Sequence, residues 1–176
     1  MNTGARLLSF NSSSVMDGSS SFSCHLELYH SLVNFGFFVF IQEMELSGST
    51  AGGCREDFLQ FGRDILFVTT HLSERYCGKV ERPRLKTNLA GASSQISHRS
   101  YTENSDLEMD IWLHVGAMKS KSLVLVVTPM KQSCESSDTL YQQCGRSGVC
   151  VRKELICDGM VNCPFDDGVW RGNWRI

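Results

Sequence analysis

The sequence predicts a mainly β protein, in which an antiparallel β-sandwich is followed by a small disulfide-rich module. The first reason is a series of short segments in which apolar and polar residues alternate, as they do along a half-buried strand. The second is that no segment carries a long apolar period of 3.6 residues, which marks an amphipathic helix. The third is the crowding of five of the eight cysteines between positions 134 and 163.

The segments interpreted as strands are residues 22–30, 35–46, 54–61, 64–72, 107–116 and 122–129. The first and fifth alternate strictly, and the second is aromatic and β-branched before it becomes amphipathic, which predicts a strand buried at its start. The third sets Phe58 against Leu59, the fourth and last are rich in β-branched residues, and Pro129 is expected to stop the last strand. The polar stretch after Cys77 is too long for a hairpin turn, so we expect a long surface loop or a further strand near Ile96.

Changes in composition set the expected domain limits. Residues 1–21 are rich in Ser, Gly and Asn, and we expect a disordered arm there. We place the sandwich at residues 22–131 and the module at 132–168, because Cys, Gly and Asp replace the strand patterns after Pro129. Residues 169–176 form a tail that fits neither part.

The charge and the apolar runs exclude three kinds of surface or segment. The net charge is −2 and the 17 basic residues are dispersed, so we expect no nucleic-acid surface and no polybasic membrane patch. The longest apolar run, residues 35–41, is too short to span a bilayer, which takes about 20 residues. The N-terminus lacks the apolar stretch of a signal peptide, although the sequon at Asn11 fits export.

The cysteine spacing favours disulfides over a zinc site. Dense cysteines are typical of extracellular modules that are too small to be held by a core. Zinc sites usually present ligand pairs two to four residues apart, whereas the gaps after Cys134 are nine, five, six and five residues. An extracellular pattern without an export signal suggests a piece of a longer protein, or a gene model that has lost its 5′ end.

Several residues of the module stand in a fixed order. Tyr141 precedes the second cysteine, Gly148 precedes the third, Cys157-Asp158-Gly159 holds the fourth, and Asn162 precedes the fifth. In this order, residues 134–168 resemble the low-density-lipoprotein-receptor class A repeat. The resemblance implies the disulfides Cys134–Cys150 and Cys144–Cys163. The sixth cysteine of the repeat has no counterpart here, so Cys157 is expected to be unpaired.

The same resemblance implies a calcium site. The ion takes six to eight oxygen ligands, and a module with almost no core can use it as a centre. The implied ligands are the carbonyls of Leu155 and Met160, the side chains of Asp158 and Asn162, and the late acids Asp166 and Asp167. These two acids stand earlier than the acidic pair of the family. The alternative is that the Asp-Gly pairs at 158–159 and 167–168 simply form turns.

Three motifs lie in order within the sandwich segment: FIQEMEL, CREDFLQF and RYCG. With them, residues 22–130 resemble a CUB domain, an extracellular β-sandwich. The resemblance implies the disulfide Cys54–Cys77, and it leaves Cys24 unpaired because the partner would lie upstream. Many CUB domains also bind calcium, and here the matching residue is Asp57. A loop-capping carboxylate is the alternative for that residue.

The further calcium ligands of a CUB-type site are less clearly matched. Glu43 or Glu45 would supply the glutamate that accompanies Asp57, and Asp106 or Asp110 would supply the late aspartate. Catalytic motifs of hydrolases, zinc proteases and nucleotide-binding enzymes are missing from the sequence, so we expect no enzymatic activity.

The resemblances imply a non-catalytic extracellular module that binds a protein ligand, as part of the ectodomain of a membrane adaptor or co-receptor. The alternative is the non-catalytic arm of a secreted multidomain protease or protease regulator. A third reading is a misassembled gene model without a stable product.

Overall fold

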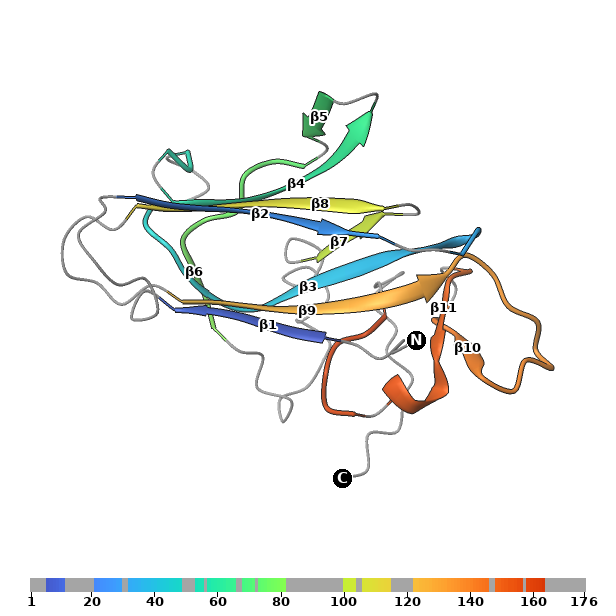
Figure 1. Ribbon diagram of the computed structural model, residues 1–176. Coiled ribbons are helices and arrows are strands. Elements are labelled where there is room, and N and C mark those ends of the chain that lie inside the picture. Colours follow the sequence, from blue (N-terminus) through green and yellow to red (C-terminus); the bar gives the residue numbers. More distant parts are fainter. Residues whose placement is uncertain are drawn as a thin grey trace.

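The computed structural model describes residues 6–11, 21–29, 32–48, 53–55, 57–65, 68–71, 73–81, 100–103, 106–114, 122–145, 148–156 and 158–163. Within these residues the fold consists of two antiparallel β-sheets, which lie face to face (Figure 1). One short 3-10 helix, η3 (Lys153–Leu155), follows the last strand. The predicted mainly antiparallel β class is therefore confirmed.

The larger sheet has seven strands and the smaller has four. The larger sheet consists of β1 (Arg6–Asn11), β3 (Phe35–Glu45), β6 (Lys79–Val80), β7 (Ser100–Glu103), β9 (Ser122–Lys131), β10 (Tyr141–Gln143) and β11 (Cys150–Arg152). The smaller sheet consists of β2 (Ser21–Leu28), β8 (Leu107–His114), β4 (Phe58–Ile65) and β5 (Val68–His71), in that order. The central pair of the larger sheet is β3 and β9, whose register runs from Phe35↔Lys131 to Glu45↔Ser122.

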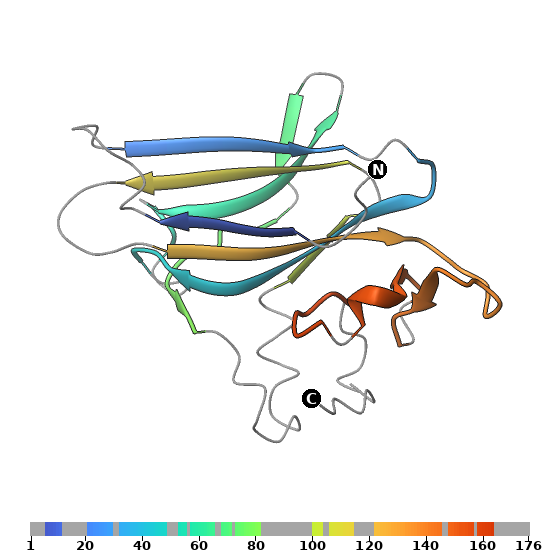
Figure 2. The same cartoon turned by 60° about the horizontal axis from the view of Figure 1, so that its bottom comes forward.

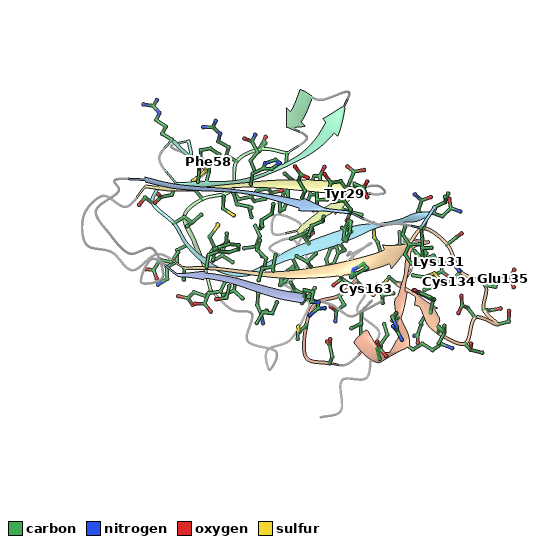
Figure 3. All side chains as sticks on the ribbon, viewed as in Figure 1. Tyr29, Phe58, Lys131, Cys134, Glu135 and Cys163 are labelled. Carbon is green, nitrogen blue, oxygen red and sulfur yellow. A yellow bond between two sulfur atoms is a disulfide. The ribbon has the colours of Figure 1, made fainter. Side chains whose placement is uncertain are left out.

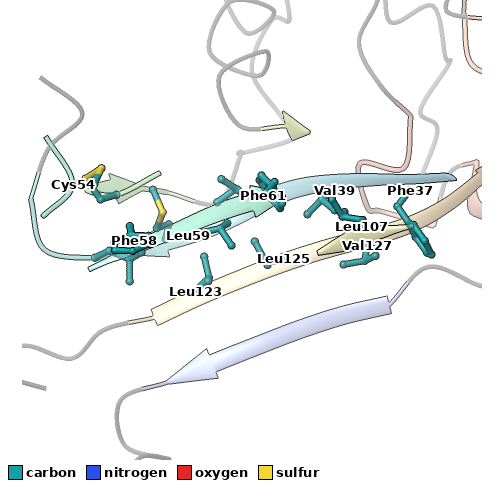
Figure 4. Packing of buried hydrophobic residues seen from close by; sticks show 14 residues of the cluster. Phe37, Val39, Cys54, Phe58, Leu59, Phe61, Leu107, Leu123, Leu125 and Val127 are labelled. Atoms are coloured by element: carbon teal, nitrogen blue, oxygen red, sulfur yellow. A yellow bond between two sulfur atoms is a disulfide. The ribbon is translucent and has the colours of Figure 1, made fainter. Parts of the chain in front are cut away.

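The main core lies between the two sheets. Alternate residues of β3 and β9 point into it, and β4 and β8 close it from the other side (Figure 4). Its members include Phe37, Val39, Ile41, Phe58, Leu59, Phe61, Leu107, Leu123 and Leu125. Burial of such side chains stabilises a fold by about 1.5–3 kcal/mol each, so this layer holds the sandwich together.

A second apolar cluster lies on the outer face of the larger sheet. Phe38 and Phe40 of β3 and Val126 and Met130 of β9 point away from the sandwich and are fully buried. The cysteine-rich module covers them, and Val151 of β11 belongs to the same cluster. This explains why β3 and β9 are almost continuously apolar, because a strand that is covered on both faces cannot alternate.

The first segment differs from the prediction. A disordered arm over residues 1–21 is wrong for residues 6–11, which form β1 and pair with β9 from Arg6↔Val127 to Asn11↔Ser122. The physical reason is that Leu8 and Phe10 pack against the main core, while β9 gains a hydrogen-bonded neighbour along that edge. A polar composition therefore concealed a short amphipathic strand.

Strand limits also differ from the predictions, and β4 spans Phe58–Ile65 where a strand over residues 54–61 is expected. Pro129 does not stop β9, which continues to Lys131. It is tolerated because β1 begins at Arg6, opposite Val127, so Pro129 lies beyond the stretch of β9 that pairs with β1. The segment 64–72 is divided between β4 and β5, which pair from Gly62↔His71 to Ile65↔Val68. Among the described residues, two short strands follow Cys77 before β8, namely β6 and β7, and the strand expected near Ile96 stays a prediction because residues 82–99 lie outside the described residues.

Candidate functional site

Three disulfides are present in the described residues. Cys54 is bonded to Cys77, with the Cα atoms 5.6 Å apart. In the module, Cys134 is bonded to Cys150 and Cys144 to Cys163, with Cα separations of 6.1 and 5.5 Å. These are the pairs that the two resemblances implied. Cys24, the unpaired thiol of the prediction, is free and half-buried on β2, and Cys157 lies outside the described residues.

Asp57 lies beside the sandwich disulfide and is fully buried. Its Oδ2 accepts a hydrogen bond of 2.9 Å from the backbone N–H of Ser47, just after the end of β3. That contact is what the loop-capping interpretation predicts. Two further ligands were expected for a calcium site at Asp57. Of their candidates, Glu45 is exposed on β3, and the side chain of Asp110 lies outside what the structure describes. Calcium binding at Asp57 stays a prediction.

The module begins where β9 ends, and its first residues contact the sandwich directly. Cys150 of β11 pairs with Lys131 of β9, so the module continues the larger sheet. Phe35 and Tyr141 meet edge to face, with ring centroids 5.8 Å apart. The backbone N–H of Gln132 donates to the carbonyl of Asn34 over 2.8 Å. Figure 2 shows the module lying along β3 and β9, outside the sandwich.

Asp138 organises the connection from β9 to β10. Its Oδ1 accepts hydrogen bonds from the backbone N–H groups of Leu140 and Tyr141, at 2.9 and 3.0 Å. Its Oδ2 lies 3.4 Å from Nζ of Lys131, whose position at the end of β9 is visible in Figure 3. The backbone hydrogen bonds, followed by Lys131, hold the pKa of the Asp138 carboxyl below its usual value. The carbonyl of Asp138 also accepts a hydrogen bond of 2.7 Å from Nζ of Lys153.

The loop expected to bind calcium runs from Leu155 to Asn162. Asp158 starts a turn by accepting the backbone N–H of Met160 at Oδ1 over 2.8 Å, and Gly159 adopts φ +83° within it. The side-chain amide of Asn162 then donates to the carbonyl of Leu155 and to Oδ1 of Asp158, each over 2.8 Å. Both the turn and the convergence of these groups were therefore foreseeable from the Cys-Asp-Gly motif.

The described part of this loop does not fit a calcium ion as it stands. Calcium takes six to eight oxygens, with several carboxylates among them. Here the side-chain NH2 group of Asn162 points at the two oxygens that an ion would share, and Asp158 is the one carboxylate of the described loop residues that makes a contact there. Among the described residues, no three His, Cys, Asp or Glu side chains gather in one place. Asp166 and Asp167 lie outside those residues, so their part of the calcium prediction is untested.

One partner of the loop escaped the sequence analysis. Thr128 of β9 is fully buried on the outer face of the larger sheet, and its hydroxyl donates to Oδ1 of Asn162 over 2.8 Å. The signal for it was weak but present. Thr128 is a polar residue at a position where Val124, Val126 and Met130 are all buried. A polar residue on an apolar face has to find a hydrogen-bond partner.

Comparisons with known proteins provide no assignment, because no protein-family model matches the chain and no curated protein is similar to it. Within the described ranges, no helix has the length and apolar character required to cross a membrane. The candidate site is therefore defined by its own geometry: a module stapled by two disulfides, seated on the outer face of a sheet, and locked to that face by Asn162 and Thr128.

Proposed function

We propose that the chain is a non-catalytic extracellular protein-binding module, within the ectodomain of a membrane adaptor or co-receptor. The observation that carries this proposal is the seating of the module. Two disulfides within the module hold its own backbone together, and a shared apolar cluster fixes it against the sandwich, so its outer surface is presented in one arrangement. A preorganised surface loses little entropy when it binds, which favours recognition of a protein ligand.

The family assignments belong to this proposal. The sandwich disulfide follows the CUB pattern, and the two module disulfides join the first cysteine to the third and the second to the fifth, as in a class A repeat. Six bonded cysteines support an oxidising, extracellular location.

The exposed surface of the module suggests where a ligand would touch. Leu140 stands between β9 and β10 with 59% of its surface exposed, although it is a large apolar residue. Glu135, from the same connection, is exposed as well, and it lies at the outer end of the module in Figure 3. An exposed apolar side chain and a carboxylate in the same connection suit a ligand surface that offers an apolar pocket and a basic group.

In the module, calcium enters this proposal only through a rearranged loop. For Oδ1 of Asn162 to face an ion, its amide would have to turn over, away from the arrangement in the structure. The missing carboxylates would have to come from Asp166 and Asp167. The protein-binding proposal does not depend on that rearrangement.

The test is a binding screen of the oxidised full chain against arrays of secreted and cell-surface proteins. We expect a ligand whose binding is lost when the disulfides are reduced and is weakened at least tenfold by Leu140→Asp. Leu7→Asp is the matched control, because Leu7 is also an exposed leucine, at 50%, but lies on β1. If both variants weakened binding equally, the ligand would contact a surface other than the one around Leu140. Hydrolysis of a peptide library by the purified chain would contradict the non-catalytic assignment.

A further inference from the structure

Asn162 is a buried side chain whose polar atoms all have partners. Only 2% of its surface is exposed, and Thr128 opposite it is fully buried. A neutral side-chain amide has two N–H donors and one oxygen acceptor. The two donors serve the carbonyl of Leu155 and Oδ1 of Asp158, and the oxygen accepts the hydroxyl of Thr128. Such a satisfied polar network in a buried place specifies one arrangement of its members.

The partners also fix which way the amide faces. Were the amide reversed, its oxygen would face the Leu155 carbonyl and the Asp158 carboxylate with no proton between them, and three oxygens would repel one another. In the observed orientation, an N–H group lies at each of the two contacts. The place that a cation would occupy between oxygens is therefore filled by amide protons.

The module also draws apolar support from the sandwich. Small disulfide-rich modules need a metal ion mainly because they have almost no core of their own. This one contributes Val151 and Cys144 to a cluster whose largest members are Phe38 and Phe40 of β3. On the same face, Thr128 of β9 lies opposite Phe38 of β3. The hydroxyl that donates to Asn162 therefore belongs to the central strand pair of the larger sheet.

We propose that the Asn162 side chain closes the 155–162 loop without a metal ion, and that Thr128 of the sandwich fixes its orientation. The proposal departs from the class A resemblance, which implies calcium at this place. The module then keeps its fold in the absence of calcium, but it depends on the sandwich. Thr128 is a positioning residue, since it acts through Asn162. Whether or not a protein ligand is found for the module, this proposal is tested separately.

The first test uses the unaltered full chain with its disulfides intact. Thermal unfolding is followed by circular dichroism in 5 mM EDTA and in roughly 5 mM calcium. A ligand that binds only the folded state raises the unfolding temperature by mass action. We expect the two Tm values to agree within about 1 °C, because the loop is already closed. A rise of more than about 5 °C in calcium that persists in Asp57→Asn, which removes the candidate calcium ligand of the sandwich, would overturn the proposal.

The second test exchanges the amide for a carboxylate. Asn162→Asp removes both N–H donors and turns acceptors toward Leu155 and Asp158. We expect the Tm in EDTA to fall by roughly 3–9 °C, with part of the loss recovered in calcium. Asn34→Asp is the control, since it makes the same chemical change at an exposed position. If N162D were as stable as the unaltered chain in EDTA, the amide would not be what closes the loop.

The third test separates the hydroxyl of Thr128 from its volume. Thr128→Val keeps the shape but leaves Oδ1 of Asn162 without a donor, whereas Thr128→Ser keeps the hydroxyl. We expect T128V to lower the Tm in EDTA by roughly 2–6 °C, and T128S to lose less than half as much. Equal losses in the two variants would show that packing, and not orientation of Asn162, is the role of Thr128. If T128V does not fold, T128S and the EDTA comparison still decide.

Discussion

Phe38 and Thr128 face each other across the central strand pair of the larger sheet, and both point away from the sandwich core. Phe38 is fully buried under the cysteine-rich module, and Thr128 reaches Asn162 of that module. The module therefore packs on the outer face of the larger sheet, which would otherwise be exposed to solvent. It follows that the sandwich and the module share one buried cluster of side chains.

Phe38→Ala tests whether this shared cluster couples the unfolding of the sandwich and the module. Truncation of a buried phenylalanine costs about 3–5 kcal/mol, because the transfer free energy is lost and a cavity remains. Since Phe38 lies under the module, we expect the loss to appear in one cooperative urea transition, followed by circular dichroism. Leu140→Ala, at an exposed position of the module, should leave the free energy of unfolding within about 0.5 kcal/mol of the original. Two separate transitions would show that sandwich and module unfold independently.

The strands were predictable to the extent that their periods were visible. Segments 22–30 and 107–116 alternate, and the structure forms β2 and β8 over most of them. The run from Phe35 to Ile41 does not alternate, and it was correctly assigned as a buried strand. What covers its outer face could not be deduced, because that depends on a module joined more than 90 residues later in the chain, around Cys134.

The site was predictable through its motif and not through its partner. The Cys-Asp-Gly turn placed Leu155, Asp158 and Asn162 near one another, and the structure brings these three into contact. The contacting atoms differ from the expectation. The side-chain NH2 group of Asn162, and not its oxygen, faces Leu155 and Asp158. Thr128 was missed because a hydrogen bond between residues 34 positions apart leaves no local pattern.

The second prediction concerns Asp138 and acid. Its folded-state pKa is depressed by the backbone N–H groups of Tyr141 and Leu140 and then by Lys131, so the charged carboxylate is favoured in the folded chain. An unfolded aspartate takes up its proton near pH 4. The stabilisation is therefore present above that pH and is lost as the pH falls through the lower folded-state pKa.

Thermal unfolding of the Asp138→Asn variant between pH 7 and pH 3 measures this contribution. We expect D138N to be less stable than the unaltered chain at pH 7, because the N–H groups of Tyr141 and Leu140 lose a charged acceptor and Lys131 loses its charged partner. The difference in Tm should shrink as the pH falls below about 4. Glu135→Gln, four positions from Lys131 in the same connection, serves as the charge-matched control. A difference that stays constant with pH would mean that the carboxylate charge is not involved.

The third prediction concerns the thiol of Cys24. This free cysteine is half-buried on β2 and packs against the main core. We expect iodoacetamide to label it slowly in the folded chain and completely in denaturant without reductant, because unfolding exposes it. Peptide mapping should find the six bonded cysteines unlabelled under the same conditions. Protection of Cys24 in denaturant would show that it is bonded after all, and the same map tests the unpaired state expected of Cys157.

The last prediction concerns β1, where composition suggested disorder. Leu8 and Phe10 of this strand pack against the main core, and its backbone pairs with β9 over six residues. Removal of residues 1–11 should therefore cost about 2–4 kcal/mol, because two half-buried apolar side chains and a row of strand hydrogen bonds are lost together. Removal of residues 1–5 is the matched control and should cost less than about 0.5 kcal/mol. Both values come from urea denaturation of the oxidised chain. Equal stability of the two truncated chains would mean that β1 contributes nothing to the sandwich, and that its pairing with β9 does not persist in solution.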